Sequence, residues 1–290
     1  MTPTLVQQHL PTPGSASASR TECTDACVRA RDWAEIQERM LVPLYEAVYE
    51  RLEVGAGTRL LGLGCGSGLA LLLAASRGAA VTGVEPAAPE RLALARERLR
   101  PGPDPAPRAE DARLLDRSPD QAAVADLPAY NLVTAFQPIG CAAGDSEGLA
   151  ALLERAAPLT ERGTPVVLAG WGPPERCTTS SVLRVAARLA DPLRATGSWR
   201  PALRDDLEEV AQRAGLRPDG SGRVACPFGY ADLDSAVRGL LSTGLFEAAI
   251  TATDPAQVEK ELTEALHPHQ RRDGTVWMAN VFRYLIARTR

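Results

Sequence analysis

Residues 60–68 have the sequence Leu60-Leu61-Gly62-Leu63-Gly64-Cys65-Gly66-Ser67-Gly68, which joins an apolar run at 58–63 to a second one at 69–76. Glycines between a strand and a helix let the backbone approach a ligand closely and adopt dihedral angles that a side chain forbids. The dinucleotide pattern G-x-G-x-x-G requires a glycine at position 67 or 69, and the phosphate-loop pattern requires Gly-Lys; this segment has neither. The G-x-G-x-G turn therefore favours a ligand without a pyrophosphate, with a purely structural turn as the alternative.

A carboxylate follows the next apolar run of the chain. Glu85 comes directly after Val81-Thr82-Gly83-Val84, 21 residues beyond Gly64. An acid at the end of the second strand of a nucleotide-binding fold is positioned to accept hydrogen bonds from both hydroxyls of a ribose. Glu85 alone could be an exposed charge at a strand end. The turn and the acid together predict a nucleoside site.

A strand–helix alternation extends on both sides of the glycine turn. Continuous apolar strands that alternate with helices indicate a parallel sheet with helices on both faces. Right-handed crossovers between such units produce a doubly wound, Rossmann-like α/β fold. The expected strands are 58–63, 80–85, a weak strand at 108–111, 130–136 and 165–171, and the expected helices are 69–76, 89–99 and 147–158.

The flanking segments do not follow this alternation. Residues 1–22 are rich in Thr, Pro, Ser and Ala without apolar periodicity, so we expect a disordered tail. Residues 25–52 have apolar side chains every three or four positions, which predicts an amphipathic helix broken near Pro43. The C-terminal third predicts helices at 180–193, 203–214, 233–249 and 255–266, a strand at 222–227 and a β-rich run at 276–287.

These elements predict one domain over residues 23–290. Its sheet would be mostly parallel with an antiparallel last strand. The segments around 23–52, 172–202 and 228–270 would form a helical cap over the carboxyl edge of the sheet, where such folds bind ligands.

Composition excludes several classes of partner. The net charge of −4 is spread over scattered acids and arginines, which argues against nucleic acid and anionic membrane as partners. The longest apolar run, Leu69 to Ala75, is too short to span a bilayer. The six cysteines lack the paired spacing of a metal or redox site. We therefore expect a cytoplasmic protein with reduced thiols and no bound metal.

On these motifs the sequence resembles the class I S-adenosylmethionine-dependent methyltransferases, from about Trp33 to the C-terminus. Segments 171–175 and 280–284 are similar to an actinobacterial branch that acts on small molecules. The resemblance implies S-adenosylmethionine as the cofactor, a small-molecule methyl acceptor, a role in secondary metabolism and a homodimer as a possible assembly. The motifs that carry it are 59–68, 81–86, 110–112 and 130–136.

The resemblance also implies which residues surround the cofactor. Gly64, Cys65 and Gly66 would face the methionine moiety, and Glu85 would hold the ribose. The remaining positions are Pro86 beside Glu85, Asp111 and Ala112 at the adenine, Phe136 and Gln137 at the sulfonium, and Trp33 and Gln37 on an N-terminal helix that closes over the cofactor.

Gly62 departs from the family pattern, which usually has an acidic residue at this position. That carboxylate helps to anchor the ammonium end of the cofactor, and losing such a charged hydrogen bond costs about 1.5–3 kcal/mol of binding free energy. The departure leaves a second hypothesis open: a methyltransferase fold repurposed for non-methyl chemistry, such as cyclisation, or for binding and regulation.

Candidates for a general base are few. His267 and His269 flank Pro268 before the last β-rich run, and an unperturbed histidine pKa suits either to take a proton from an acceptor. A solvated polar loop is the alternative for both. Aromatic residues could line an apolar substrate cleft or belong to the core; they are Trp171, Trp199, Phe228, Tyr230, Phe246 and Trp277.

Overall fold

The apolar run before the glycines forms strand β1 (Arg59–Leu63), which is buried beyond its first residue. In the computed structural model, helix α3 (Leu69–Ser76) follows the glycine turn, and strand β2 (Ala80–Val84) pairs with β1 in parallel. Helix α4 (Pro89–Arg98) continues the alternation. The structure describes residues 25–100, 112–122, 129–141, 144–190 and 206–290, so the expected tail at 1–22 lies outside the described residues.

The main sheet has seven strands in the order β3-β2-β1-β4-β5-β9-β6. Its first five strands are parallel, whereas β9 runs antiparallel to both β5 and β6. The mostly parallel sheet with an antiparallel last strand is thereby confirmed. The remaining strands are β3 (Arg113–Leu115), β4 (Leu132–Ile139), β5 (Pro165–Trp171), β6 (Arg217–Ala225) and β9 (Val281–Arg288).

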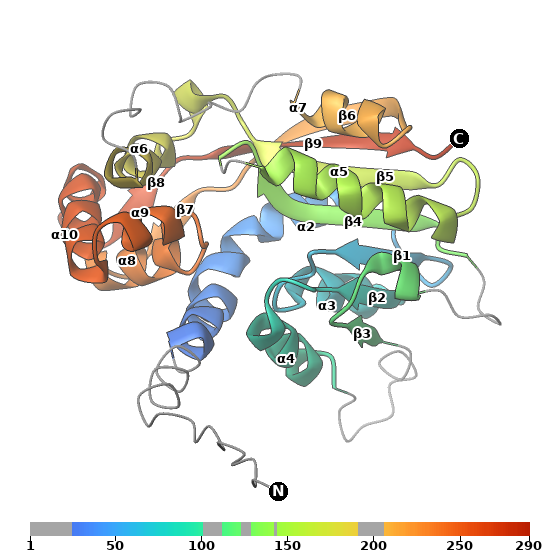
Figure 1. The fold of residues 1–290 in the computed structure, drawn as a ribbon, viewed down its shortest axis with the longest axis horizontal. Coiled ribbons are helices and arrows are strands. Elements are labelled where there is room, and N and C mark those ends of the chain that lie inside the picture. Colours follow the sequence, from blue (N-terminus) through green and yellow to red (C-terminus); the bar gives the residue numbers. More distant parts are fainter. Residues whose placement is uncertain (1–24, 101–111, 123–128, 142–143, 191–205) are drawn as a thin grey trace, which may run out of the picture.

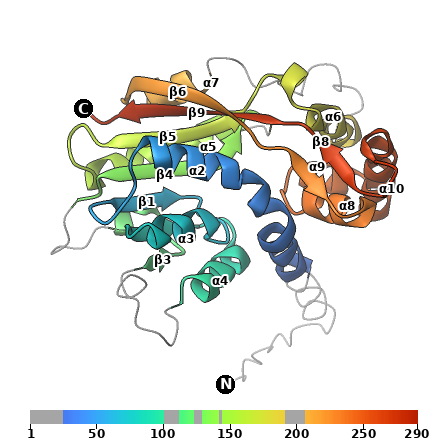
Figure 2. The same cartoon turned by 180° about the vertical axis from the view of Figure 1, so that it is seen from behind.

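Helices cover both faces of this sheet (Figures 1 and 2). Helix α2 (Val42–Arg51) packs beside α3 on one face, within the larger of two apolar clusters. Helices α5 (Asp145–Ala156) and α7 (Asp206–Arg213) cover the opposite face and form the second cluster. The two-faced covering explains why the central strands are apolar without alternation.

A group of helices lies beyond the carboxyl ends of the parallel strands (Figure 1). Helix α6 packs on α9 and α10, and α10 packs on α8, beside a small antiparallel sheet of β7 and β8. No helix of the described part is long and apolar enough to cross a membrane. The bounds are α6 (Thr179–Ala190), α8 (Leu233–Leu241), α9 (Glu247–Ala252), α10 (Pro255–Leu266), β7 (Phe228–Tyr230) and β8 (Val276–Met278).

Some element predictions were wrong. The helix expected at 233–249 is two helices, because Gly244 adopts a left-handed φ of +79° between α8 and α9 and ends the first. The β-rich run at 276–287 is likewise two strands, since the chain passes from the small sheet to the main one. The weak strand expected at 108–111 falls outside the described residues; the third strand of the sheet is β3.

The N-terminal helix is irregular, but not at Pro43. Residues 25–32 are helical, a π turn follows at Trp33–Gln37 and a 3-10 turn at Glu38–Leu41. Pro43 lies in the first turn of α2, where its missing N–H has no helical partner to lose. The irregular turns therefore precede the proline, at the residues that approach the glycine loop.

Candidate ligand-binding site

The glycine loop between β1 and α3 is held open towards the N-terminal helix. Gly64 and Gly66 adopt left-handed φ angles of +61° and +57°, which favour glycine. The Cys65 N–H donates to the Val84 carbonyl oxygen at 3.1 Å, and the Gly66 N–H donates to Glu85 Oε2 at 2.9 Å. The loop is thus tied to the end of β2, and the bare Cα of Gly66 faces Trp33 and Glu38.

Glu85 is buried where β2 ends, with 5% of its surface exposed. Burial raises the pKa of its carboxyl, and the Gly66 N–H bond and the nearby Arg91 charge oppose that rise. Glu85 Oε1 also accepts a long bond of 3.3 Å from the Ala87 N–H. The carboxylate is therefore positioned by the loop and by its own strand end, as the sequence predicted for an acid that faces a nucleoside.

The N-terminal helical segment closes over the glycine loop through Trp33 and Glu38. A Cβ atom at Gly66 would stand 3.2 Å from both Trp33 Nε1 and Glu38 Oε1. Glu38 is 2% exposed, and its Oε2 accepts from Ser67 Oγ at 2.5 Å and from Arg98 Nη1 at 2.6 Å. Arg98 also donates to the Ser67 carbonyl oxygen at 2.9 Å, so it fastens α4, the loop and the N-terminal segment together.

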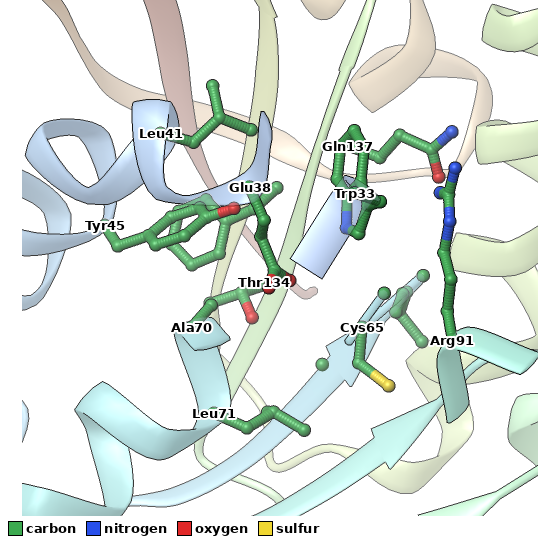
Figure 3. Close-up of a pocket in the computed structure, with 15 residues that line it drawn as sticks. Trp33, Glu38, Leu41, Tyr45, Cys65, Ala70, Leu71, Arg91, Thr134 and Gln137 are labelled. Carbon is green, nitrogen blue, oxygen red and sulfur yellow. The ribbon is translucent and has the colours of Figure 1, made fainter. Parts of the chain in front are cut away.

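Arg91 reaches from α4 into the same region. Its guanidinium carbon lies 4.3 Å from the centre of the Trp33 ring, and its Nη2 donates to the Ser242 carbonyl oxygen at 2.5 Å. Burial lowers the Arg91 pKa, and the carboxylates of Glu85 and Glu38 oppose that shift. Figure 3 shows Trp33 beside the extended Arg91 side chain, with Glu38 nearer to α3.

Three adjoining cavities surround these residues. The first, the glycine-loop cavity, lies between the glycine loop, the N-terminal helical segment and the end of β4. Figure 3 draws all of its lining residues, which are Trp33, Glu38, Leu41, Tyr45, Gly62, Leu63, Gly64, Cys65, Gly66, Ala70, Leu71, Arg91, Thr134, Phe136 and Gln137.

The second cavity, the Glu85 cavity, shares Arg91 and Gln137 with the first. Its lining also includes Glu85 and the residues that follow it, Ala87 and Ala88. The two cavities therefore adjoin at the shared side chains of Arg91 and Gln137, near the carboxyl ends of β1 and β2, where folds of this kind bind ligands.

The third, the aromatic cavity, shares Trp33, Leu41 and Gln137 with the glycine-loop cavity. Trp171 packs on Phe282 and Phe228, with ring centres 4.6 and 5.9 Å apart. None of the described residues in its lining is ionisable; they are Trp33, Gln37, Leu41, Gln137, Pro138, Trp171, Phe228, Thr243, Leu245 and Phe282.

Most of the expected cofactor residues meet here. Gln37 lines the aromatic cavity and Glu85 lines the Glu85 cavity, whereas Pro86 and Ala112 line none of the three cavities. Asp111 and Trp199 lie outside the described residues. The expected residues that line the glycine-loop cavity are Trp33, Gly64, Cys65, Gly66, Phe136 and Gln137.

The two expected bases lie elsewhere. His267 and His269 form a 3-10 turn at the end of α10, and neither lines any of the three cavities. Partial burial lowers the pKa of His269. Of the other aromatic candidates, Phe246 is fully buried in the core and Trp277 is 42% exposed.

Sequence reasoning missed Glu38 and Arg91. Both sit on helical segments whose polar side chains give no periodic signal, and Glu38 directly follows a π turn that changes which side chains share a face. A proline or a glycine would have marked an irregular turn, but the π turn at Trp33–Gln37 contains neither.

Solved structures of other proteins match this fold over most of the chain. The YcgJ protein from Bacillus subtilis matches at 14% identity and a TM-score of 0.53, over 85% of this chain and 97% of that one. A putative methyltransferase from Bacillus halodurans matches at 13% identity and a TM-score of 0.51, over 83% and 97%. The chain has a class I methyltransferase fold.

Other structures share this methyltransferase fold. The [4+2]-cyclase SpnF matches at 15% identity and a TM-score of 0.50, over 85% of this chain and 80% of that one. No protein-family model and no curated protein sequence matches the chain. At these identities the likeness extends to the methyltransferase fold, and activity has to be argued from the site.

Proposed function

We propose that this chain binds S-adenosylmethionine in the glycine-loop and Glu85 cavities and methylates a small apolar molecule held in the aromatic cavity. The observation that carries the proposal is that the three cavities adjoin at the carboxyl edge of the sheet, with Gln137 in the lining of all three. Trp33 and Gln137 line both the glycine-loop cavity and the aromatic cavity, so a donor in one would face an acceptor in the other.

The residues present fit this cofactor. Glu38 and Trp33 pack against the bare Gly66, and the Trp33 indole N–H is buried without a hydrogen-bond partner among the described residues. Buried donors are rarely left unpaired, so this N–H points to a ligand acceptor. Glu85 would accept the ribose hydroxyls, at an additional cost in affinity if its bond to Gly66 had to be given up.

S-adenosylmethionine supplies a methyl group on a positively charged sulfur, which a nucleophile can displace directly. The chain would contribute positioning, because holding donor and acceptor in line supplies much of the rate of such a transfer. The aromatic lining would exclude water and hold an apolar body, while Gln37, Gln137 and Thr243 offer the polar atoms to orient it.

The described lining of the aromatic cavity has no ionisable side chain, and this restricts which acceptors could be methylated there. An acceptor that must lose a proton before attack needs a general base. We infer an acceptor whose nucleophilic atom attacks first and loses any proton to bulk water only after the product has left the cavity. We extend this proposal to secondary metabolism, on the resemblance of 171–175 and 280–284.

A mass-labelling assay tests the proposal. Wild-type protein is incubated with S-adenosylmethionine that carries a deuterated methyl group and with a panel of neutral aromatic and isoprenoid acceptors. A product with the labelled methyl group, formed more slowly by Gln137→Ala, would support methyl transfer. Tight cofactor binding without any labelled product across the panel would count against it.

The second candidate is a cofactor-binding fold used for non-methyl chemistry such as cyclisation. It is favoured by Gly62, because the space a side chain would need there is filled: a Cβ atom would stand 2.8 Å from Leu71 Cδ2. Conversion of an apolar substrate with no change in mass, in the same assay, would support this candidate instead.

A further inference from the structure

Strand β1 brings no charge into the glycine-loop cavity. Gly62 and Leu63 line it, and Leu71 from α3 occupies the space beside Gly62. Among the described residues that line this cavity, Glu38 is the one carboxylate. A cationic ligand group in this cavity would therefore find its counter-charge on the N-terminal helical segment.

The π turn explains how Glu38 comes to face the loop. The Glu38 N–H donates to the Trp33 carbonyl oxygen, an i→i+5 bond. Residues five apart lie on different sides of a regular α-helix, whereas the wider π turn brings them towards one side. Both side chains therefore approach Gly66, each 3.2 Å from the point where its Cβ atom would be.

The two side chains offer complementary, unused polar atoms. Both hydrogen bonds that described residues give to the Glu38 carboxylate go to Oε2, so Oε1 remains available beside Gly66. Trp33 Nε1 is buried and has no partner within the described part of the chain. An acceptor with negative charge and a free donor, both close to one bare glycine, suit a zwitterionic amino-acid group.

We propose that Glu38 binds the α-ammonium of S-adenosylmethionine, with the Trp33 indole N–H donating to the neighbouring carboxylate. This inference rests on the proposed cofactor. Ser67 and Arg98 hold Glu38 through the oxygen that the ammonium does not use, so the carboxylate is fixed before the ligand arrives. The charge that binds the cofactor's amino-acid end thus comes from a different element than β1.

Two ligands separate this role from cofactor binding as a whole. S-adenosylhomocysteine has the amino-acid group, whereas 5′-methylthioadenosine keeps the adenosine and the sulfur but lacks that group. Calorimetric titration should show that Glu38→Gln raises the Kd of S-adenosylhomocysteine about tenfold or more, as expected for the loss of a charged hydrogen bond. The Kd of 5′-methylthioadenosine should change less than about twofold.

Ser67→Ala is the matched control, because it removes one hydrogen bond to Glu38 Oε2 and leaves the carboxylate in place. It should shift the ratio of the two Kd values much less than Glu38→Gln does, because the carboxylate that would bind the ammonium and its Arg98 partner both remain. A change in that ratio equal to that of Glu38→Gln would assign Glu38 a purely structural role and overturn the inference.

A ligand change gives the same information without relying on a variant that may not fold. The analogue of S-adenosylhomocysteine with hydrogen in place of its amino group should bind wild-type protein about tenfold more weakly than the parent ligand. Equal binding of analogue and parent would refute the Glu38 contact while leaving the cofactor proposal intact. Failure of both S-adenosylhomocysteine and 5′-methylthioadenosine to bind would instead refute the proposed cofactor.

Discussion

Replacing Gly66 with alanine perturbs the site by one methyl group. Gly66 has a φ of +57°, a conformation that costs a residue with a side chain about 1–2 kcal/mol. The added Cβ atom would stand 3.2 Å from Glu38 Oε1 and 3.2 Å from Trp33 Nε1, so the two side chains proposed to bind the ligand would have to shift. We therefore expect two separate effects, one on stability and one on binding.

The stability effect should be modest. A loss of about 1–2 kcal/mol corresponds to a fall in Tm of about 2–8 °C for a chain of this size class. The effect on binding should be larger, because the methyl group displaces both Glu38 Oε1 and Trp33 Nε1, the two atoms proposed to bind the ligand. We expect the Kd of S-adenosylhomocysteine to rise at least about tenfold, which is about 1.4 kcal/mol.

Gly163→Ala is the matched control. Gly163 has a similar left-handed φ of +78°, but a Cβ atom there would meet nothing within 4 Å. It lines none of the three cavities. Thermal melting and calorimetry should show a comparable fall in Tm for both variants and weaker binding only for Gly66→Ala. A folded Gly66→Ala that binds as tightly as Gly163→Ala would refute the placement of the ligand.

Three further perturbations have defined outcomes. Burial raises the pKa of the Glu85 carboxyl above its ordinary 4.5. As the pH is lowered, the affinity for S-adenosylhomocysteine should therefore begin to fall while the pH is still above 4.5. The Glu85→Gln variant should not show this pH dependence. The raised pKa of Glu85 stabilises the folded protein at low pH, and this stabilisation is lost as the pH rises through that pKa. Weaker binding at low pH therefore cannot result from unfolding caused by Glu85. Trp171→Ala should raise the KM for an apolar acceptor about tenfold without changing the Kd of S-adenosylhomocysteine, because it lines only the aromatic cavity; equal losses for both ligands would contradict separate subsites. Gly62→Asp should lower the free energy of unfolding by about 1–3 kcal/mol through overpacking against Leu71 and should not tighten binding; tighter binding, measured by calorimetry, would mean that Leu71 yields and that β1 can anchor the ligand.

The order of elements around the glycine loop could be predicted because each has a strong local signal. Strand 165–171, helix 69–76 and helix 255–266 have the predicted bounds. Their apolar periods and flanking glycines or prolines are properties of short segments. The division of 233–249 was missed because one glycine inside a helical pattern is usually tolerated, and its left-handed conformation depends on tertiary packing.

The candidate site could be predicted only in part. Gly64, Gly66 and Glu85 follow strand ends, and the carboxyl ends of parallel strands meet at one edge, so their proximity follows from topology. Glu38 lies on a segment distant in sequence, and its approach to Gly66 depends on a π turn without a sequence marker. Composition and spacing gave no indication that a buried carboxylate would come from there.

The strand-like backbone at Gly62 also changes the interpretation of the departure from the family pattern. The sequence showed only that an acid is missing, which suggested a weakened site. The structure shows that Leu71 fills the adjoining space and that another carboxylate lines the same cavity. The departure favours the non-methylating candidate only if Glu38 does not replace the missing carboxylate, so binding measurements decide between a rebuilt anchor and a lost one.

The most direct test of the proposed cofactor is calorimetric titration of the full chain with S-adenosylhomocysteine, repeated with Glu85→Ala. We predict saturable binding at one site per chain, with a Kd at least about tenfold weaker in a Glu85→Ala variant that still melts cooperatively. Folded wild-type protein that shows no binding, or a folded Glu85→Ala variant with unchanged affinity, would contradict the assignment of these cavities to S-adenosylmethionine.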